Sequence, residues 1–371
     1  MFNKRKGNLK GNVIGKVFSI LFVLTFFQLA ENKAISNEKK HPVIVNPKNP
    51  QLDNKKLRLC VEKAFTKEIL FSVPKEDVQV TIDSKGNIYV VDSESAAIKV
   101  FDKNGILISQ FVKRVKKEEI VFPVNLLITP HNEILIKDKA KFCLYLFSSQ
   151  GKLLKKIPYS IPNLGKIRIN SKGNIIADCF NYGGSEALFE IYEYDKELNF
   201  IKTLNSWDVS EALIKKELLY FGRYIDWELM SDDRLVIGRS DTYTFYICSP
   251  DGNVIREFKK EYEAARISPE EMERELNRAS PSAKEKLKNI VYHKAFQYFT
   301  IDNENRIIVR TWEKTIDNKN YYYDVFNPEG VYISRFEGNF YIKKWMNEEF
   351  LAVEDLPDGR SILKKYKVIW N

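Results

Sequence analysis

Charged residues recur at one position of a repeated strand pattern. In each repeat this is the position where the second strand is expected to end. These are Asp92, Asp138, Arg239, Arg310 and Glu354. Three carboxylates on one rim could coordinate a hard cation such as calcium, which prefers oxygen ligands. Carboxylates facing two arginines could instead orient a zwitterionic or polar ligand such as a peptide or a sugar. An aspartate at this position also often ties its own loop through backbone hydrogen bonds, and that structural alternative stays open.

A repeated phrase of strands and turns must position these residues. Residues 80–92 read VTIDSKGNIYVVD and residues 98–111 read IKVFDKNGILISQF. The alternating apolar residues predict half-buried strands, and Asp83 with Gly86 predicts a tight turn between them. Degraded copies occupy residues 126–154, 167–195, 229–255 and 299–333. Their spacing of roughly 40–50 residues, stretched by insertions, is typical of a stacked array such as a propeller.

The sixth copy is one strand short. Residues 340–342, 350–353 and 361–369 supply three strands. We expect residues 57–61 to pair with residues 362–369 and complete the sheet, because closing the ring removes exposed sheet edges. The predicted fold class is therefore all-β, a six-bladed β-propeller of four-stranded blades.

The first copy resembles the repeats of NHL-type six-bladed β-propellers of exported bacterial proteins. The resemblance extends over roughly residues 57–371 and rests on Asp83, residues 86–90, Asp92, residues 100–102 and Gly105. Members of that family include carbohydrate- or peptide-handling enzymes, nucleic-acid binders and scaffolds, so the resemblance implies a fold rather than one activity. Its enzymes usually hold a metal around the central channel with His, Asp, Glu or Asn side chains, and Asp92, Asp138 and Glu354 are the carboxylates here that could hold calcium.

Two long insertions with helical signals flank the fourth blade. The first, residues 205–224 between blades 3 and 4, contains the capping pair Asp208 and Glu211. The second, residues 259–294 between blades 4 and 5, contains Ser-Pro helix starts at residues 268–269 and 280–281. Apolar residues at helical spacing in the second insertion either pack onto the propeller or form a cap over its mouth.

The meander divides the turns between two faces. Tight turns such as residues 83–87 and 102–106 lie on one face, the Gly-turn face. Second-to-third loops such as residues 92–97 and both insertions lie on the other, the loop face. Function usually resides on long loops held by a rigid scaffold, so we expect the ligand on the loop face. The candidate ligand-binding residues are Asp92, Asp138, Arg239, Arg310, Glu354 and the aromatic Trp207, Tyr220 and Tyr224.

Motifs of common catalytic centres are missing from the sequence. It contains no Gly-x-Ser-x-Gly, His-Glu-x-x-His or Cys-x-x-Cys, no phosphate loop and no dinucleotide-binding fingerprint. The three histidines, His41, His131 and His293, fall in segments that are not expected to meet on a metal. We therefore predict a ligand- or protein-binding module without a required cofactor. The alternative is a metal-assisted hydrolase or lyase acting on a sugar, a lactone or a similar small substrate.

The N-terminus predicts export. Residues 1–16 hold five cations and no acids, and residues 17–27 read VFSILFVLTFF. This pattern is typical of a signal peptide, and the apolar run is shorter than the roughly 20 residues that span a bilayer. Residues 1–34 are the predicted signal peptide, with an uncleaved membrane anchor as the alternative, and residues 35–56 form an extended lead-in to the propeller at 57–371. The expected location is periplasmic or extracellular.

Charge and cysteine content limit the partners. Loss of the five cations in residues 1–16 lowers the net charge from +9 to +4, which argues against nucleic-acid binding. We expect a protein or a small polar or carbohydrate ligand and a monomeric state.

The four cysteines, Cys60, Cys143, Cys179 and Cys248, lack metal-ligand spacing. Cys248 aligns with Phe101 and Phe147, so unpaired thiols within the core are expected.

Overall fold

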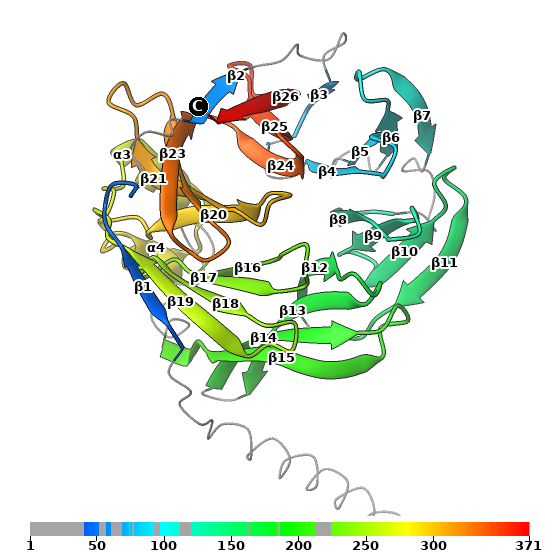
Figure 1. Ribbon diagram of the computed structural model, residues 1–371, viewed down its shortest axis with the longest axis horizontal. Coiled ribbons are helices and arrows are strands. Elements are labelled where there is room, and N and C mark those ends of the chain that lie inside the picture. Colours follow the sequence, from blue (N-terminus) through cyan, green and yellow to red (C-terminus); the bar gives the residue numbers. More distant parts are fainter. Residues whose placement is uncertain are drawn as a thin grey trace, which may run out of the picture. The chain divides into compact units, whose positions relative to one another are not determined.

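Six sheets, each with four antiparallel strands at its centre, stand around a common axis and form a ring, as the strand pairing and Figure 1 show. The structure is a computed structural model. It describes residues 41–51, 57–60, 69–73, 75, 78–91, 97–111, 120–161, 163–183, 186–211 and 224–370. Residues from Pro42 onward form one compact unit. The predicted six-bladed β-propeller is thereby confirmed.

The first three blades follow one another along the chain. Blade 1 consists of β4 (Gln79–Ile82), β5 (Ile88–Val91), β6 (Ile98–Phe101) and β7 (Leu107–Phe111). Blade 2 consists of β8 (Pro123–Ile128), β9 (Ile134–Asp138), β10 (Cys143–Phe147) and β11 (Leu153–Pro158). Blade 3 consists of β12 (Leu164–Ile169), β13 (Ile175–Gly183), β14 (Glu186–Tyr194) and β15 (Phe200–Asp208).

The other three blades continue the same order. Blade 4 consists of β16 (Ile225–Leu229), β17 (Leu235–Arg239), β18 (Thr244–Cys248) and β19 (Val254–Lys260). Blade 5 consists of β20 (Phe296–Ile301), β21 (Ile307–Lys314), β22 (Tyr321–Phe326) and β23 (Tyr332–Gly338). Blade 6 takes β24 (Tyr341–Met346), β25 (Glu349–Asp355) and β26 (Ser361–Trp370) from the C-terminal part of the chain.

N-terminal strands complete the sixth blade. β2 (Leu57–Cys60) pairs antiparallel with the end of β26, with Leu57 opposite Trp370 and Cys60 opposite Lys367. The expected closure is confirmed. A second short strand, β3 (Ile69–Phe71), pairs with the beginning of the same β26, and it was not predicted.

The lead-in contributes a strand that was not predicted. β1 (Val43–Asn46) pairs in parallel with β19 and adds a fifth, outermost strand to blade 4 (Figure 1). Asn46 is fully buried there. Its Nδ2 donates to the carbonyl oxygen of Gly330 at 2.8 Å, and its Oδ1 accepts the Tyr332 N–H at 2.9 Å. One side chain thus ties β1 and blade 4 to blade 5.

Apolar clusters fill all six interfaces between neighbouring blades, because each strand buries alternate side chains toward the blades beside it. At the interface that closes the ring, Leu351 and Val353 of blade 6 pack with Val80 and Val90 of blade 1. Cys248 is fully buried between blades 3 and 4, as its alignment with core phenylalanines predicts. Cys143, Cys179 and Cys248 are free thiols.

The tight turns share one pattern of side-chain-to-backbone hydrogen bonds. In the first, Asp83 Oδ1 accepts the backbone N–H groups of Lys85 at 2.9 Å and Asn87 at 2.8 Å. Gly86 adopts a φ of +84°, which costs glycine little because it has no Cβ. These local bonds fix the Gly-turn face.

The loop between β19 and β20 contains α3 (Pro269–Arg278) and α4 (Pro281–Leu287). α3 begins at a capping box formed by Ser268 and Glu271. Apolar side chains of this loop pack against Trp312 of β21, in agreement with the alternative that they pack onto the propeller. They are Met272, Leu276, Ala279, Leu287 and Ile290.

The first predicted insertion starts later than expected. Residues 205–208 belong to β15 rather than to a loop, because they continue the pairing with β14. Asp208 Oδ1 accepts the Ser210 N–H at 2.9 Å. Residues 212–223 lie outside the described residues. No helix in the described part of the chain is both long and apolar enough to cross a membrane.

Candidate functional site

Asp138 ends β9 and holds its own loops together. It is fully buried. Its two carboxylate oxygens accept the N–H groups of Val121 at 2.6 Å, Phe122 at 3.2 Å, Ala140 at 2.9 Å and Lys141 at 3.2 Å. Four backbone N–H groups donate to this carboxylate. Asp138 therefore holds its own loops through backbone hydrogen bonds, which is the alternative to a role in ligand binding.

Arg239 ends β17 and belongs to a partly exposed polar cluster on blade 4. It forms a bidentate ion pair with Asp241, with Nη2 at 2.7 Å from Oδ2 and Nε at 3.3 Å from Oδ1. The Tyr224 hydroxyl donates to the same Oδ2 at 2.9 Å. Burial and Asp241 together raise the pKa of Tyr224. Lys294 Nζ lies 6.0 Å from the centroid of the Tyr224 ring. Two cations, a carboxylate and a phenol therefore meet here.

An aromatic pair lies beside this polar cluster. Trp207 near the end of β15 contacts Tyr246 of β18, with ring centroids 4.7 Å apart and planes at 46°. Both side chains are half-buried. Arg239 of β17 lies opposite Thr244 of β18, so Tyr246 is its diagonal neighbour on the same face of the sheet, and the aromatic pair lies close to that ion pair. Burial and then Glu257 raise the pKa of Tyr246. We call Trp207, Tyr246, Arg239, Asp241 and Tyr224 the blade 3–4 surface.

Arg310 lies apart, between blades 5 and 6, and is only 2% exposed. Its guanidinium carbon is 4.4 Å from the centroid of the Tyr321 ring, 5.8 Å from that of Tyr341 and 5.9 Å from that of Tyr323. Its Nε is buried and has no hydrogen-bond partner. Among the described residues no carboxylate forms an ion pair with it. Sequence reasoning selected the residue but gave no indication of this enclosure.

The remaining candidates are Glu354, Asp92 and Tyr220. Glu354 forms an ion pair with Lys364 across β25 and β26, at 2.8 Å from Oε2 to Nζ. Asp92 and Tyr220 lie outside the described residues. Within the described ranges, no hydrogen bond or ion pair joins Asp138, Arg239, Arg310 and Glu354 to one another. These contacts do not test whether the four residues share one rim, and the rim of mixed charge stays a prediction.

Two second strands are longer than the alignment of the repeats predicts. β13 continues past Asp178 and Cys179 to Gly183, and β21 continues past Arg310 and Thr311 to Lys314. The sequence alignment placed strand ends at these residues by analogy with blade 1. Both strands are longer because β13 continues to pair with β14, and β21 with β22, beyond these residues.

A buried ionic network between blades 4 and 5 was missed by sequence reasoning. Asp324 of β22 is fully buried and accepts hydrogen bonds from Arg335 Nε at 2.8 Å, Tyr332 Oη at 2.8 Å and Tyr243 Oη at 2.5 Å. Lys260 Nζ lies 3.4 Å from the same carboxylate. Burial raises the pKa of Asp324, but Arg335 and Lys260 outweigh burial and lower it. The signal in the sequence was an aspartate inside the otherwise apolar and aromatic strand YYYDVF.

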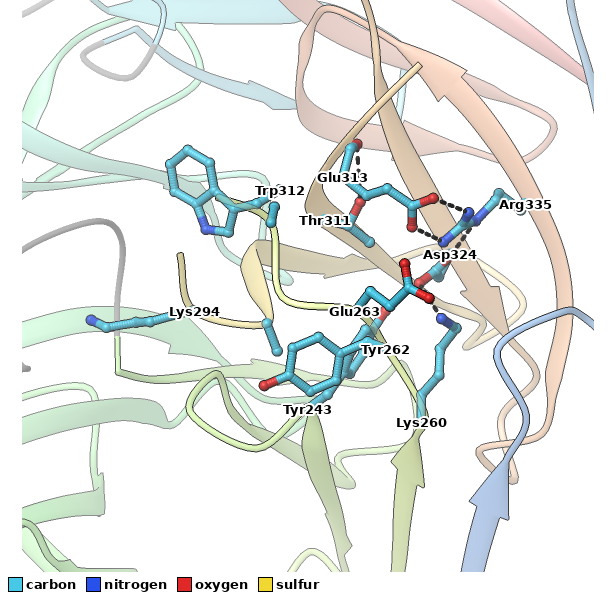
Figure 2. A pocket seen from close by; sticks show the side chains of 12 residues that line it. Tyr243, Lys260, Tyr262, Glu263, Lys294, Thr311, Trp312, Glu313, Asp324 and Arg335 are labelled. Atoms are coloured by element: carbon cyan, nitrogen blue, oxygen red, sulfur yellow. Dashed lines mark hydrogen bonds and ion pairs between the residues drawn. The ribbon is translucent and has the colours of Figure 1, made fainter. Parts of the chain in front are cut away.

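The cavity next to this network is small. Figure 2 shows Arg335 between Glu313 and Asp324, with Trp312 and Lys294 on the opposite side of the view. The enclosed space is about 10 Å³, which is room for roughly one water molecule. This arrangement stabilises the blade interface and leaves no volume for an organic ligand.

A larger cavity lies on the Gly-turn face between blades 3 and 4. It has a volume of about 240 Å³, with Leu204 and Leu229 on its apolar wall and Glu193, Lys202 and Asp251 among its polar residues. Lys202 Nζ lies 2.6 Å from Asp251 and 3.6 Å from Glu193. Sequence reasoning missed this cavity because its residues come from short turns and separate strands that no motif connects.

Charged residues also pair on the innermost strands β12 and β16. Lys166 Nζ lies 3.0 Å from Asp226 and 2.6 Å from Glu228, and Arg168 Nη2 lies 2.6 Å from Glu228. Burial raises the pKa of Glu228, but Arg168 and Lys166 outweigh it and lower the pKa to about 2. The cluster is therefore a set of ion pairs that bind blade 3 to blade 4.

His293 anchors the helical insertion to blade 5. Its Nε2 lies 3.1 Å from Glu271 Oε2, and its ring stacks on Trp312 with centroids 3.9 Å apart. Lys314 Nζ contacts the other oxygen of Glu271 at 3.1 Å. Burial lowers the pKa of His293, although Glu271 acts in the opposite direction. Within the described residues, no group of three or more His, Cys, Asp or Glu side chains is arranged to hold a metal ion.

Comparison with family models gave no match, and comparison with curated proteins gave none. Among solved structures, a presumed exported protein from Bacteroides fragilis NCTC 9343 is similar with a TM-score of 0.58 at 12% identity, over 89% of this chain and 99% of that one. A member of the DUF4221 family from Bacteroides vulgatus ATCC 8482 is similar with a TM-score of 0.50 at 11% identity, over 85% and 99%. At such identities the likeness is one of fold alone.

Proposed function

We propose that this protein is an exported β-propeller that binds a polar ligand on its loop face, either a carbohydrate or an extended peptide of a partner protein. The observation that carries the proposal is the blade 3–4 surface. It combines an aromatic pair, Trp207 and Tyr246, with the partly exposed ion pair of Arg239 and Asp241.

The chemistry of this surface suits polar recognition. The Arg239 side chain is 30% exposed and that of Asp241 is 24% exposed, so both can reach a ligand without giving up their mutual ion pair. Aromatic rings offer apolar area at a low cost in conformational entropy, and they pack against sugar C–H faces or peptide side chains. A neighbouring arginine and carboxylate supply directional donors and acceptors.

Export is supported by the N-terminal pattern of a basic stretch followed by a short apolar run. The name of the similar Bacteroides fragilis protein agrees with this, although the likeness to it is one of fold. We assign the blades to the NHL type on the first repeat, whose Asp83 and Gly86 form the turn that the resemblance implies. No observation among the described residues favours the metal-assisted alternative.

Binding to two immobilised arrays tests the proposal, one of oligosaccharides and one of short peptides. Any hit is then measured by isothermal titration calorimetry. Trp207→Ala combined with Arg239→Ala is expected to weaken binding by about 2 kcal/mol, or roughly 30-fold, if these residues are anchors. The matched control is Lys85→Ala with His131→Ala on the Gly-turn face, which should leave the affinity unchanged. An affinity that responds only to the control pair would contradict the assignment of the loop face.

A further inference from the structure

Arg310 is the charged side chain whose situation the fold explains least. Buried charges are normally paired, as Asp324 is with Arg335 and Lys260. Arg310 is 2% exposed and contacts tyrosine rings, and no carboxylate in the described part of the chain forms an ion pair with it. A buried guanidinium without such a pair is a favourable partner for an anion from outside.

Two of the tyrosine hydroxyls nearby bond to backbone groups rather than to Arg310. The Tyr323 hydroxyl donates to the carbonyl oxygen of Phe340 at 2.5 Å, and the Tyr298 hydroxyl accepts the N–H of Ile342 at 2.8 Å. These tyrosines therefore serve the backbone of blade 6. Of the three guanidinium nitrogens, Nε is enclosed without an acceptor, whereas Nη1 and Nη2 are not fully enclosed and make no hydrogen bond among the described residues.

The local charge favours an anion. Arg310 and Lys343 both contact the Tyr341 ring, at 5.8 Å and 4.7 Å from its centroid. Lys314 Nζ lies 5.5 Å from the Tyr321 ring that covers Arg310. Three cations thus surround two tyrosines. Lys314 is paired with Glu271, and no carboxylate of the described residues forms an ion pair with Arg310.

We propose that Arg310 is the anchor of a carboxylate-binding subsite between blades 5 and 6. Its two terminal nitrogens form an end-on fork that matches the two oxygens of a planar carboxylate. The faces of Tyr321 and Tyr341 limit the space beside the fork, which favours a flat carboxylate over a tetrahedral phosphate. The subsite lies on a different pair of blades from the blade 3–4 surface, so it stands whether or not that surface binds a ligand.

Matched pairs of small probes test the subsite. Thermal unfolding of the full chain is followed with galacturonate against galactose, and with N-acetylalanine against N-acetylalaninamide. The carboxylate member of each pair is expected to raise Tm in a concentration-dependent manner, and the neutral member should not. Inorganic phosphate is expected to give a smaller shift. If no carboxylate raises Tm, or if phosphate does so more strongly, the proposal is overturned.

Variants connect the effect to Arg310. Arg310→Met is expected to lose at least tenfold in affinity for the carboxylate that shifts Tm most, and Arg310→Lys should lose less because it keeps the charge. Arg360→Met removes a half-exposed arginine of the turn between β25 and β26 and should bind like the wild type. Unchanged affinity in Arg310→Met would overturn the proposal. If that variant does not fold, ¹⁵N spectra of the wild-type arginine side chains decide. One enclosed guanidinium should respond to the carboxylate probe, and no response would overturn the proposal.

Discussion

Asp324→Asn is expected to destabilise the propeller strongly, because it removes the buried carboxylate that is paired with Lys260 and that shares Arg335 with Glu313. Asp324 and the Lys260 side chain are 0% and 2% exposed, and the Arg335 side chain is 19% exposed. Asparagine preserves the size of the side chain but replaces an acceptor oxygen with an N–H₂ group. Whichever oxygen it replaces, that group would face two donors. These are Arg335 and Tyr332 at Oδ1, or Tyr243 and Lys260 at Oδ2.

The magnitude follows from the burial of the partners. Removing one member of a buried ion pair costs about 3–5 kcal/mol, since the remaining charge stays without compensation. For a domain of this size that corresponds to a fall in Tm of about 10 °C. The control is Glu354→Gln, because the Glu354–Lys364 pair has side chains that are 21% and 28% exposed. Partly exposed pairs of this kind contribute about 0–1 kcal/mol.

The assay is urea unfolding at several pH values. Arg335 and Lys260 outweigh burial and lower the pKa of Asp324 in the folded state. Its stabilising contribution is therefore complete above the unfolded pKa of about 3.9 and is lost as pH falls through the lower folded pKa. The difference between wild type and Asp324→Asn should be large at pH 7 and shrink below about pH 4.

A double variant separates charge from packing. Asp324→Asn with Lys260→Met removes the orphaned ammonium and should recover at least about 1 kcal/mol relative to Asp324→Asn alone. The reasoning is refuted if Asp324→Asn costs no more than Glu354→Gln at pH 7, or if the double variant is less stable than the single one.

Three further predictions concern backbone, ring closure and export. Gly252→Ala should cost more than about 3 kcal/mol in urea unfolding, because its Cβ would lie 1.7 Å from the Leu204 carbonyl oxygen. Gly173→Ala is the matched control at φ +82° with open space around it, and should cost only the left-handed strain of about 1–2 kcal/mol. Deleting residues 35–62 should lower Tm sharply in calorimetry, since β1 and β2 are lost, and an unchanged transition would contradict the closure argument. Mass spectrometry of protein from its native host should show loss of about the first 30 residues, and an intact Met1 in the cytoplasmic fraction would exclude export.

Much of the fold could be predicted because its signals are local. Alternating apolar residues define strands wherever they occur, and Asp83 and Gly86 specify their turn within five residues. The repeat then implies the blade, and a missing strand implies the pairing of β2 with β26. The apolar character of Cys248 was likewise visible from its position in the repeat.

The candidate site could be predicted only in part. Trp207, Tyr224 and Arg239 were selected and lie in one surface, yet Asp241 and Tyr246 were missed because nothing in the sequence marks them as neighbours. Asp138 has the residue type of a ligand-binding group, but four backbone donors occupy it.

The sequence by itself determined the blades, their turns and their order, since each depends on residues that are close along the chain. The tertiary structure decided that β1 joins blade 4, that Asp324 meets Lys260, and that Arg310 lies among tyrosines with no ion pair to a carboxylate of the described residues. These outcomes depend on which faces of two neighbouring blades meet once the ring has closed. The strand pattern is equally regular around Asp324, which is paired across such an interface, and around Arg310, which has no ion pair with a described residue. Only the side chains that face the charge distinguish the two cases.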